Sequence, residues 1–136
     1  MKRSAEFGSS AEIAEQLVVE VVVRDLEHSL AFYTALGFTL ARRDGGFAAL
    51  QWGARWLFLD QRSDLPELSG PARANARIIV ADVDQLWATA QALGLPVERP
   101  IANRSYGLRD FTVRDPDGFE LRFATPLEVS PDAPAR

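Results

Sequence analysis

Hydrophobic residues follow one pattern that occurs twice along the chain. Each copy begins with a β-branched run that predicts a strand, continues with an aspartate suited to cap a helix, and ends at a glycine suited to stop one. The aspartates are Asp25 and Asp82, each glycine follows 12 residues later, and the copies are 57 residues apart. In between, apolar residues recur at helical spacing over 26–36 and 83–93, which predicts two amphipathic helices. Such repetition predicts a pseudo-symmetric domain of two similar halves that share a cleft.

Segments rich in β-forming residues and bounded by turn residues predict three more strands after each helix. The first strand of each half starts near residues 18 and 75. The other predicted strands cover 38–42, 47–52, 55–60, 96–100, 108–114 and 119–124. Each half is therefore predicted to be a βαβββ module, and the fold class is α+β.

The same reading predicts one folded domain with two extensions. The predicted segments are a flexible leader at 1–16, a single domain over 17–124 and a C-terminal tail at 125–136, with the domain divided into a module at 17–60, a linker at 61–74 and a module at 75–124.

Composition narrows the range of functions. At 136 residues, with 47% hydrophobic and 25% charged residues, the chain is long enough for one packed core. A net charge of −4 without a dense basic run argues against nucleic acid as a partner. The absence of cysteine excludes disulfides, thiolate catalysis and thiolate metal sites. The sequence has no run of about 20 apolar residues to span a membrane and no secretory signal, so we expect a cytoplasmic protein.

Two segments resemble a known superfamily. The stretch from Asp25 to Phe38 reads DLEHSLAFYTALGF, similar to a DLxxSxxFYxxxLGF helix, and Tyr106 to Gly118 reads YGLRDFTVRDPDG, similar to a YGxRxFxxxDPDG hairpin. With the repeat, they make residues 17–124 resemble the vicinal oxygen chelate superfamily of glyoxalase I, extradiol dioxygenases and bleomycin-resistance proteins. The resemblance implies paired βαβββ modules that form a curved mixed β-sheet with a cleft. This scaffold hosts unrelated chemistries, so it implies the fold more directly than the function.

The enzymes of this superfamily hold a divalent metal with histidine and glutamate side chains, one from each key strand. The resemblance places these positions on Val18, Phe58, Asn75 (or Ala76 after a one-residue slip) and Arg122. Such residues do not form a His/Glu metal site, and an arginine would repel the ion. The resemblance therefore implies no metal, no cofactor and no catalytic residue. The single histidine, His28, lies off the apolar stripe of its helix, which favours an exposed residue over a general base.

Strand alternation places several charged residues on the same face as those four positions. Two interpretations stay open: mutual salt bridges across a half-buried sheet, or a charged floor that orients a ligand. Aromatic residues on the neighbouring strands and loops suit a flat ligand. The candidate ligand-binding residues are Glu20, Trp52, Trp56, Phe58, Asp60, Arg77, Tyr106, Arg109 and Arg122. We expect Arg122 to contact Glu20 or Glu120, and a ligand to enter between the loop 103–109 and the two tryptophan strands.

Loss of the metal ligands is most similar to bleomycin-resistance proteins, which bind an antibiotic without altering it in grooves between two subunits. We therefore predict a non-catalytic, homodimeric protein that binds and sequesters an antibiotic-type molecule, a bleomycin-like compound among the candidates. The acidic chain favours a cationic or amphipathic aromatic ligand. Two alternatives remain: a metal-dependent lyase, isomerase or dioxygenase with non-standard ligands, and a dimeric interaction or regulatory module with a vestigial cleft.

Overall fold

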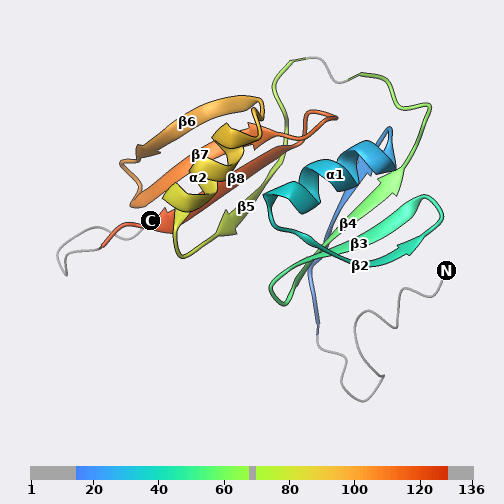
Figure 1. Ribbon diagram of the computed structural model, residues 1–136, viewed down its shortest axis with the longest axis horizontal. Coiled ribbons are helices and arrows are strands. Elements are labelled where there is room, and N and C mark those ends of the chain that lie inside the picture. Colours follow the sequence, from blue (N-terminus) through green and yellow to red (C-terminus); the bar gives the residue numbers. More distant parts are fainter. Residues whose placement is uncertain (1–14, 68–69, 129–136) are drawn as a thin grey trace.

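The structure is a computed structural model that describes residues 15–67 and 70–128, so most of the predicted leader and tail lie outside the described residues. Two helices and eight strands form two modules that lie side by side (Figure 1). The first module contains β1 (Val19–Val23), α1 (Leu26–Leu36), β2 (Thr39–Asp44), β3 (Phe47–Trp52) and β4 (Arg55–Gln61). The second contains β5 (Asn75–Ile79), α2 (Val83–Ala92), β6 (Val97–Asn103), β7 (Leu108–Arg114) and β8 (Glu120–Pro126). The predicted α+β class and the repeated βαβββ module are confirmed.

Both modules have the same sheet topology. The strand order is β1-β4-β3-β2 in the first sheet and β5-β8-β7-β6 in the second. The pairs β1/β4 and β5/β8 are parallel and all other pairs are antiparallel, so each sheet is mixed. In both sheets, the strand that precedes the helix lies at an edge, and residues of the two edge strands β1 and β5 line one pocket between the modules.

Local sequence signals set the limits of α1. The Asp25 carboxylate accepts a hydrogen bond from the backbone N–H of His28 at 3.3 Å, which caps the helix as predicted. Gly37 ends the helix with φ of 124°, a conformation that favours glycine. A Cβ atom at Gly37 would also come within 3.2 Å of the Trp52 ring. Gly37 is therefore needed both for the turn and for the close approach of Trp52.

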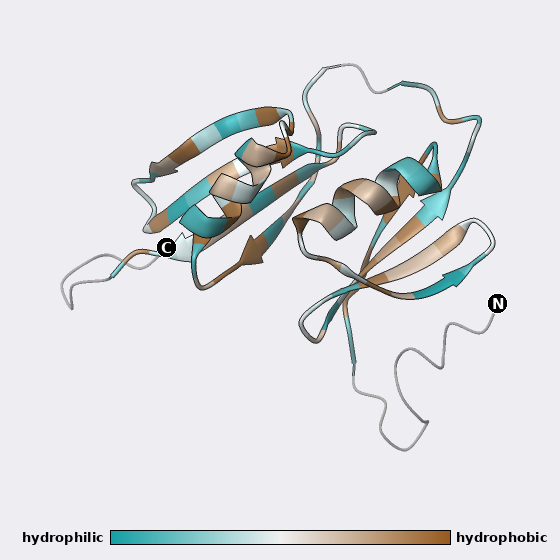
Figure 2. Cartoon of the chain, in the orientation of Figure 1, coloured by the Kyte–Doolittle hydropathy of each residue, from teal (hydrophilic) through white to brown (hydrophobic). Residues whose placement is uncertain are grey.

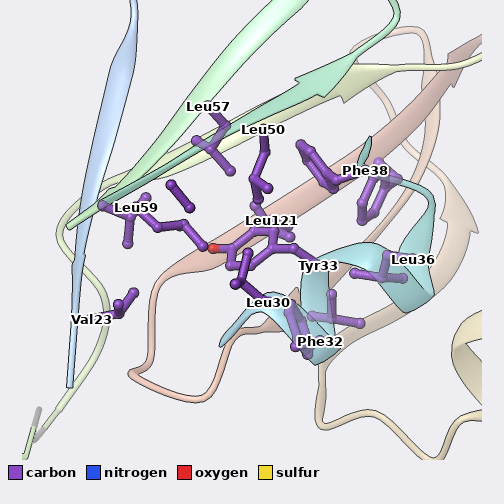
Figure 3. Close-up of a cluster of buried hydrophobic side chains, with 14 of the residues drawn as sticks. Val23, Leu30, Phe32, Tyr33, Leu36, Phe38, Leu50, Leu57, Leu59 and Leu121 are labelled. Carbon is purple, nitrogen blue, oxygen red and sulfur yellow. The ribbon is translucent and has the colours of Figure 1, made fainter. Parts of the chain in front are cut away.

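The two helices cover one face of the sheets and bury a core that continues from one module into the other. Figure 3 shows Tyr33 of α1 among leucines from both modules, with Leu50 from β3 and Leu121 from β8. On α2, the Trp87 ring packs edge-on against Phe111 with centroids 5.2 Å apart. This shared core joins the modules through apolar contacts.

A second connection between the modules is polar. The Tyr33 hydroxyl donates to Asp115 Oδ2 at 2.8 Å, and both residues are buried. Asp115 Oδ1 accepts the backbone N–H groups of Asp117 and Phe119 at 2.9 and 2.8 Å. The backbone N–H and Nε of Arg24 donate to Asp117 Oδ1 at 3.2 and 3.1 Å. These bonds fasten the turn between β7 and β8 to the first module.

The strands differ from their predicted limits mainly in the second module. Strand β6 continues to Asn103 instead of ending at residue 100, and β8 continues to Pro126 instead of Ala124. Both extensions pair with β7, in which Arg109 lies opposite Asn103 and Leu108 lies opposite Pro126. Pairing with β7 decides these ends, and the local pattern of β6 or β8 alone does not report that pairing. No helix in the described part of the chain has the length and apolar character needed to cross a membrane.

Candidate ligand-binding site

Each sheet has one face that the helices leave uncovered. In the first sheet, this face is aromatic. Phe47, Ala49 and Phe58 are buried together, with Val18 and Trp56 packed against them. The Phe47 and Phe58 rings meet edge-on with centroids 5.1 Å apart. In Figure 2, β3 is hydrophobic along most of its length, as expected for a strand covered on both faces.

The corresponding face of the second sheet carries charges. Asp110 has an exposed fraction of 0% and accepts hydrogen bonds from Arg104 Nε and from the Tyr106 hydroxyl, both at 2.7 Å. Arg122 Nη2 lies 3.6 Å from Asp110 Oδ2 and donates to the Tyr106 hydroxyl at 2.9 Å. The Arg77 guanidinium lies 5.7 Å from the centroid of the Tyr106 ring, a cation–π distance. We call these five residues the arginine cluster.

Asp110 holds the arginine cluster together as an ionised group. Burial alone would raise its pKa, but the hydrogen bonds from Tyr106 and Arg104 and the charges of Arg104 and Arg122 keep the pKa of Asp110 below its usual value. Asp110 is therefore a carboxylate at neutral pH and balances part of the positive charge around it.

A pocket of about 400 Å³ lies between the two sheets, beside the edge strands β1 and β5. Its first wall contains the aromatic rings of Trp52 and Trp56 together with Arg55, and its second wall contains Arg77. The rest of the lining is apolar: Val19, Phe38, Leu57, Ala76, Ile78 and Ile79.

A larger pocket of about 490 Å³ is lined by residues 20–22 of β1, by residues 65–67 and 72–74 between the modules, and by residues 117–119 of the turn between β7 and β8. It contains none of the tryptophans and no member of the arginine cluster. We therefore assign the candidate site to the smaller pocket, where aromatic and polar groups converge.

The structure brings most of the predicted site residues together. Trp52, Trp56 and Arg77 line the pocket, and Phe58 packs against Trp56 with ring centroids 6.2 Å apart. Tyr106 contacts Arg77 from the arginine cluster. The two tryptophans of the predicted access route line this pocket, whereas the loop 103–109 does not, and residues of β5 line it instead.

Three predicted site residues lie elsewhere. Glu20 borders the larger pocket, and Asp60 lies opposite Phe47 and Val22, outside the lining of either pocket. Arg109 points to the opposite face of β7 from Asp110, because neighbouring residues of a strand alternate in direction. There its guanidinium donates to Asp84 of α2 at 2.8 Å, and this bond holds the pKa of Asp84 below its usual value.

The predicted partner of Arg122 is wrong. Arg122 pairs with Asp110 instead of Glu20 or Glu120. The register explains this result, because Thr112 lies opposite Arg122 and Asp110 is its diagonal neighbour on the same face. Glu120 pairs with Arg114 at 3.4 Å.

Sequence reasoning missed Asp110 and Arg104, although the chain carried a signal for the first. A charged residue directly before Phe111 and Val113, which alternate into the core, must lie on the polar face of β7. Arg104 lies in the loop after β6, and its reach to Asp110 depends on how that loop folds back along β7.

The residues at the superfamily's metal positions do not fit a metal ion. Val18 packs on the aromatic face, Phe58 is buried, and Arg122 is bound to Asp110. The fourth position, Asn75, is exposed at the start of β5. Within 15–67 and 70–128, no three histidine, cysteine, aspartate or glutamate side chains gather into a possible metal site. We therefore derive no chemical step that passes through a metal.

Comparisons with known proteins agree with this architecture. The sequence model of the Glyoxalase/Bleomycin resistance protein/Dioxygenase superfamily matches residues 16–123. A bleomycin resistance protein from Geobacillus stearothermophilus is 30% identical over 124 residues, which cover 79% of this chain and 94% of the relative.

Solved structures share the fold. A glyoxalase/bleomycin resistance protein/dioxygenase from Alicyclobacillus acidocaldarius matches with a TM-score of 0.71 and 23% identity, over 84% of this chain and 92% of that one. A bleomycin-binding protein in complex with bleomycin matches with a TM-score of 0.66 and 24% identity, over 82% and 98% of the two chains. The resemblance carried by the helix and hairpin motifs is confirmed: the chain belongs to the glyoxalase/bleomycin resistance/dioxygenase superfamily.

Proposed function

We propose that this protein binds and sequesters a small antibiotic-type molecule without altering it. The observation that carries the proposal is the character of the four metal positions. Two of them, Val18 and Phe58, belong to a hydrophobic cluster that also contains aromatic rings, and a third, Arg122, is a paired cation. Side chains of these kinds suit contact with an organic molecule and not the binding of a metal ion. The 30% identity to a bleomycin resistance protein supports the same conclusion.

The geometry of the pocket supports binding of a small molecule. Its volume of about 400 Å³ falls within the range of about 300–1,000 Å³ that is typical of ligand sites. Trp52 is held by contacts with Phe38 and Phe123, whose ring centroids lie 4.9 and 5.6 Å away. A rigid aromatic wall of this kind loses little conformational entropy when a flat ligand binds.

Bleomycin is the first ligand to test, with tryptophan emission as the signal. Because Trp52 and Trp56 line the pocket, we expect a saturable change in emission, while Trp87 contributes a constant background from the core. Trp56→Leu should reduce that change, whereas Leu93→Ser, an exposed change outside the pocket, should not. Bleomycin recovered afterwards should keep its mass. A modified compound would favour the enzymatic alternative, and no binding at any accessible concentration would contradict a bleomycin-like ligand.

We also propose that the protein is a homodimer. In the described part of the chain, β1 and β5 each pair with one strand only, and Val19 and Ile79 on them have exposed fractions of 41% and 54%. Unpaired strand edges with exposed apolar side chains favour contact with a second copy. Sedimentation equilibrium at micromolar concentration should give about twice the 15.0 kDa chain mass.

A charge in this surface should separate the copies. Ile79→Glu is expected to shift the equilibrium to the monomer, and Leu93→Glu, at a position after α2 that is also exposed, serves as the matched control. A monomeric wild type that still binds ligand would contradict the dimer.

A further inference from the structure

Positive charge at the pocket has no counter-ion of its own. Arg55 and Arg77 are the charged residues in the lining, and no carboxylate accompanies them. None of the ion pairs within the described residues involves Arg77. The Nε atom of Arg77 is buried without a hydrogen-bond partner, and the guanidinium group lies over the face of the Tyr106 ring. A half-buried guanidinium in this state has unused donors.

The neighbouring carboxylates are already engaged. Arg77 lies directly opposite Arg122 in the pairing of β5 with β8, and like charges at such positions repel each other. Asp110 serves both Arg104 and Arg122. The arginine cluster therefore contains three guanidinium groups and one carboxylate, which is paired with only two of them. Two glutamates of this sheet, Glu98 and Glu120, both form ion pairs with Arg114.

We propose that the pocket takes a planar aromatic molecule that carries a carboxylate. The carboxylate binds the Arg77 guanidinium, whose fork of donors matches two oxygen atoms, and the ring lies against Trp52 and Trp56. This inference rests on the proposed small-molecule function and names the chemical class of its ligand. It replaces the cationic ligand that the acidic composition favours. The net charge of −4 belongs to the whole chain, whereas the groups that line the pocket set the local sign.

Three probes with one ring system and different charges test the inference by isothermal titration calorimetry. They are naphthalene-2-carboxylate, 2-naphthylmethanol and 2-naphthylmethylamine. We expect the carboxylate to bind about tenfold or more tightly than the alcohol, since it adds a charge-assisted hydrogen bond, and the amine to bind most weakly. Raising the salt concentration should reduce the difference in affinity between the carboxylate and the alcohol.

Variants identify the residues responsible. Arg77→Gln should weaken binding of the carboxylate and remove its preference over the alcohol. Arg99→Gln, an exposed change on β6 outside the pocket, should preserve both affinities. Trp56→Leu should weaken the binding of the carboxylate and of the alcohol by the same factor. Melting curves establish that each variant is folded. Arg55→Gln, at an exposed position of the lining, removes the other positive charge of the pocket.

The inference is overturned if the carboxylate fails to bind, if the three probes bind equally, if the amine binds most tightly, or if folded Arg77→Gln keeps the preference. The bleomycin titration separates this failure from failure of the proposed function. If bleomycin binds and is recovered intact while the naphthalene probes show no charge preference, the proposed carboxylate ligand is wrong and the proposed function stands.

Discussion

Replacing Asp115 with alanine is expected to lower the free energy of unfolding by about 3 kcal/mol or more. This buried carboxylate accepts three hydrogen bonds, from the Tyr33 hydroxyl and from the backbone N–H groups of Asp117 and Phe119. Burial raises the pKa of Tyr33 well above its usual value, so its hydroxyl remains a donor at neutral pH. Alanine leaves all three donors without an acceptor and releases the β7–β8 turn from the first module. Urea unfolding followed by circular dichroism measures the loss, which corresponds to a fall of roughly 10 °C in melting temperature.

Two milder variants serve as controls for the Asp115 prediction. Asp115→Asn keeps the side-chain shape and an oxygen for the two backbone N–H groups, so its loss should be much smaller. Tyr33→Phe removes one of the three bonds and keeps the edge-on ring contacts with Phe32 and Phe38, so a loss of about 1–2 kcal/mol is expected. If Asp115→Ala unfolds at the same urea concentration as the wild type, the turn is not held in this way.

Replacing Asp110 with alanine is the second large effect that we expect. Removing one partner of a buried ion pair typically costs about 3–5 kcal/mol, because the remaining charge has lost its compensation. The side chains of Arg104 and Arg122 are 15% and 19% exposed, so some water reaches them, and the lower end of that range, about 3 kcal/mol, is expected. Chemical unfolding again gives the measurement.

The chain offers a matched control for the Asp110 prediction. Asp84→Ala breaks the ion pair between Asp84 and Arg109, which lies in solvent on the other side of the second sheet, and should leave stability nearly unchanged. Asp110→Asn retains the hydrogen bonds without the charge, so its stability should lie between those of Asp110→Ala and Asp84→Ala. Equal stabilities for Asp110→Ala and Asp84→Ala would mean that water already screens the arginine cluster.

The parts of the fold that depend on local signals could be predicted from the sequence. The limits of α1 follow from Asp25 and Gly37, whose capping and chain-terminating roles need no tertiary information. Strand β3 lies between two glycine turns and β7 between a glycine and an aspartate turn, and both have their predicted limits. The ends of β6 and β8 were misplaced because pairing with β7 sets them.

The site could be predicted only in part, for a related reason. Alternation along single strands indicated the tryptophan wall and Arg77, but not which strands face each other across the pocket. Arg109 was misassigned because its direction depends on the side of β7 that α2 covers. The partner of Arg122 depends on a diagonal contact between β7 and β8, which exists only once their register is known.

Metal content tests the central claim most directly, namely that the residues at the superfamily's metal positions hold no metal ion and that the protein binds an organic molecule instead. Protein purified without chelators is analysed for zinc, nickel, manganese and iron by mass spectrometry, before and after incubation with an excess of each ion. Because Val18, Phe58, Asn75 and Arg122 occupy the metal positions, we expect only a small fraction of one ion per chain, and the same ligand binding with or without EDTA. About one tightly bound ion per chain, with ligand binding lost after EDTA treatment, would contradict the account.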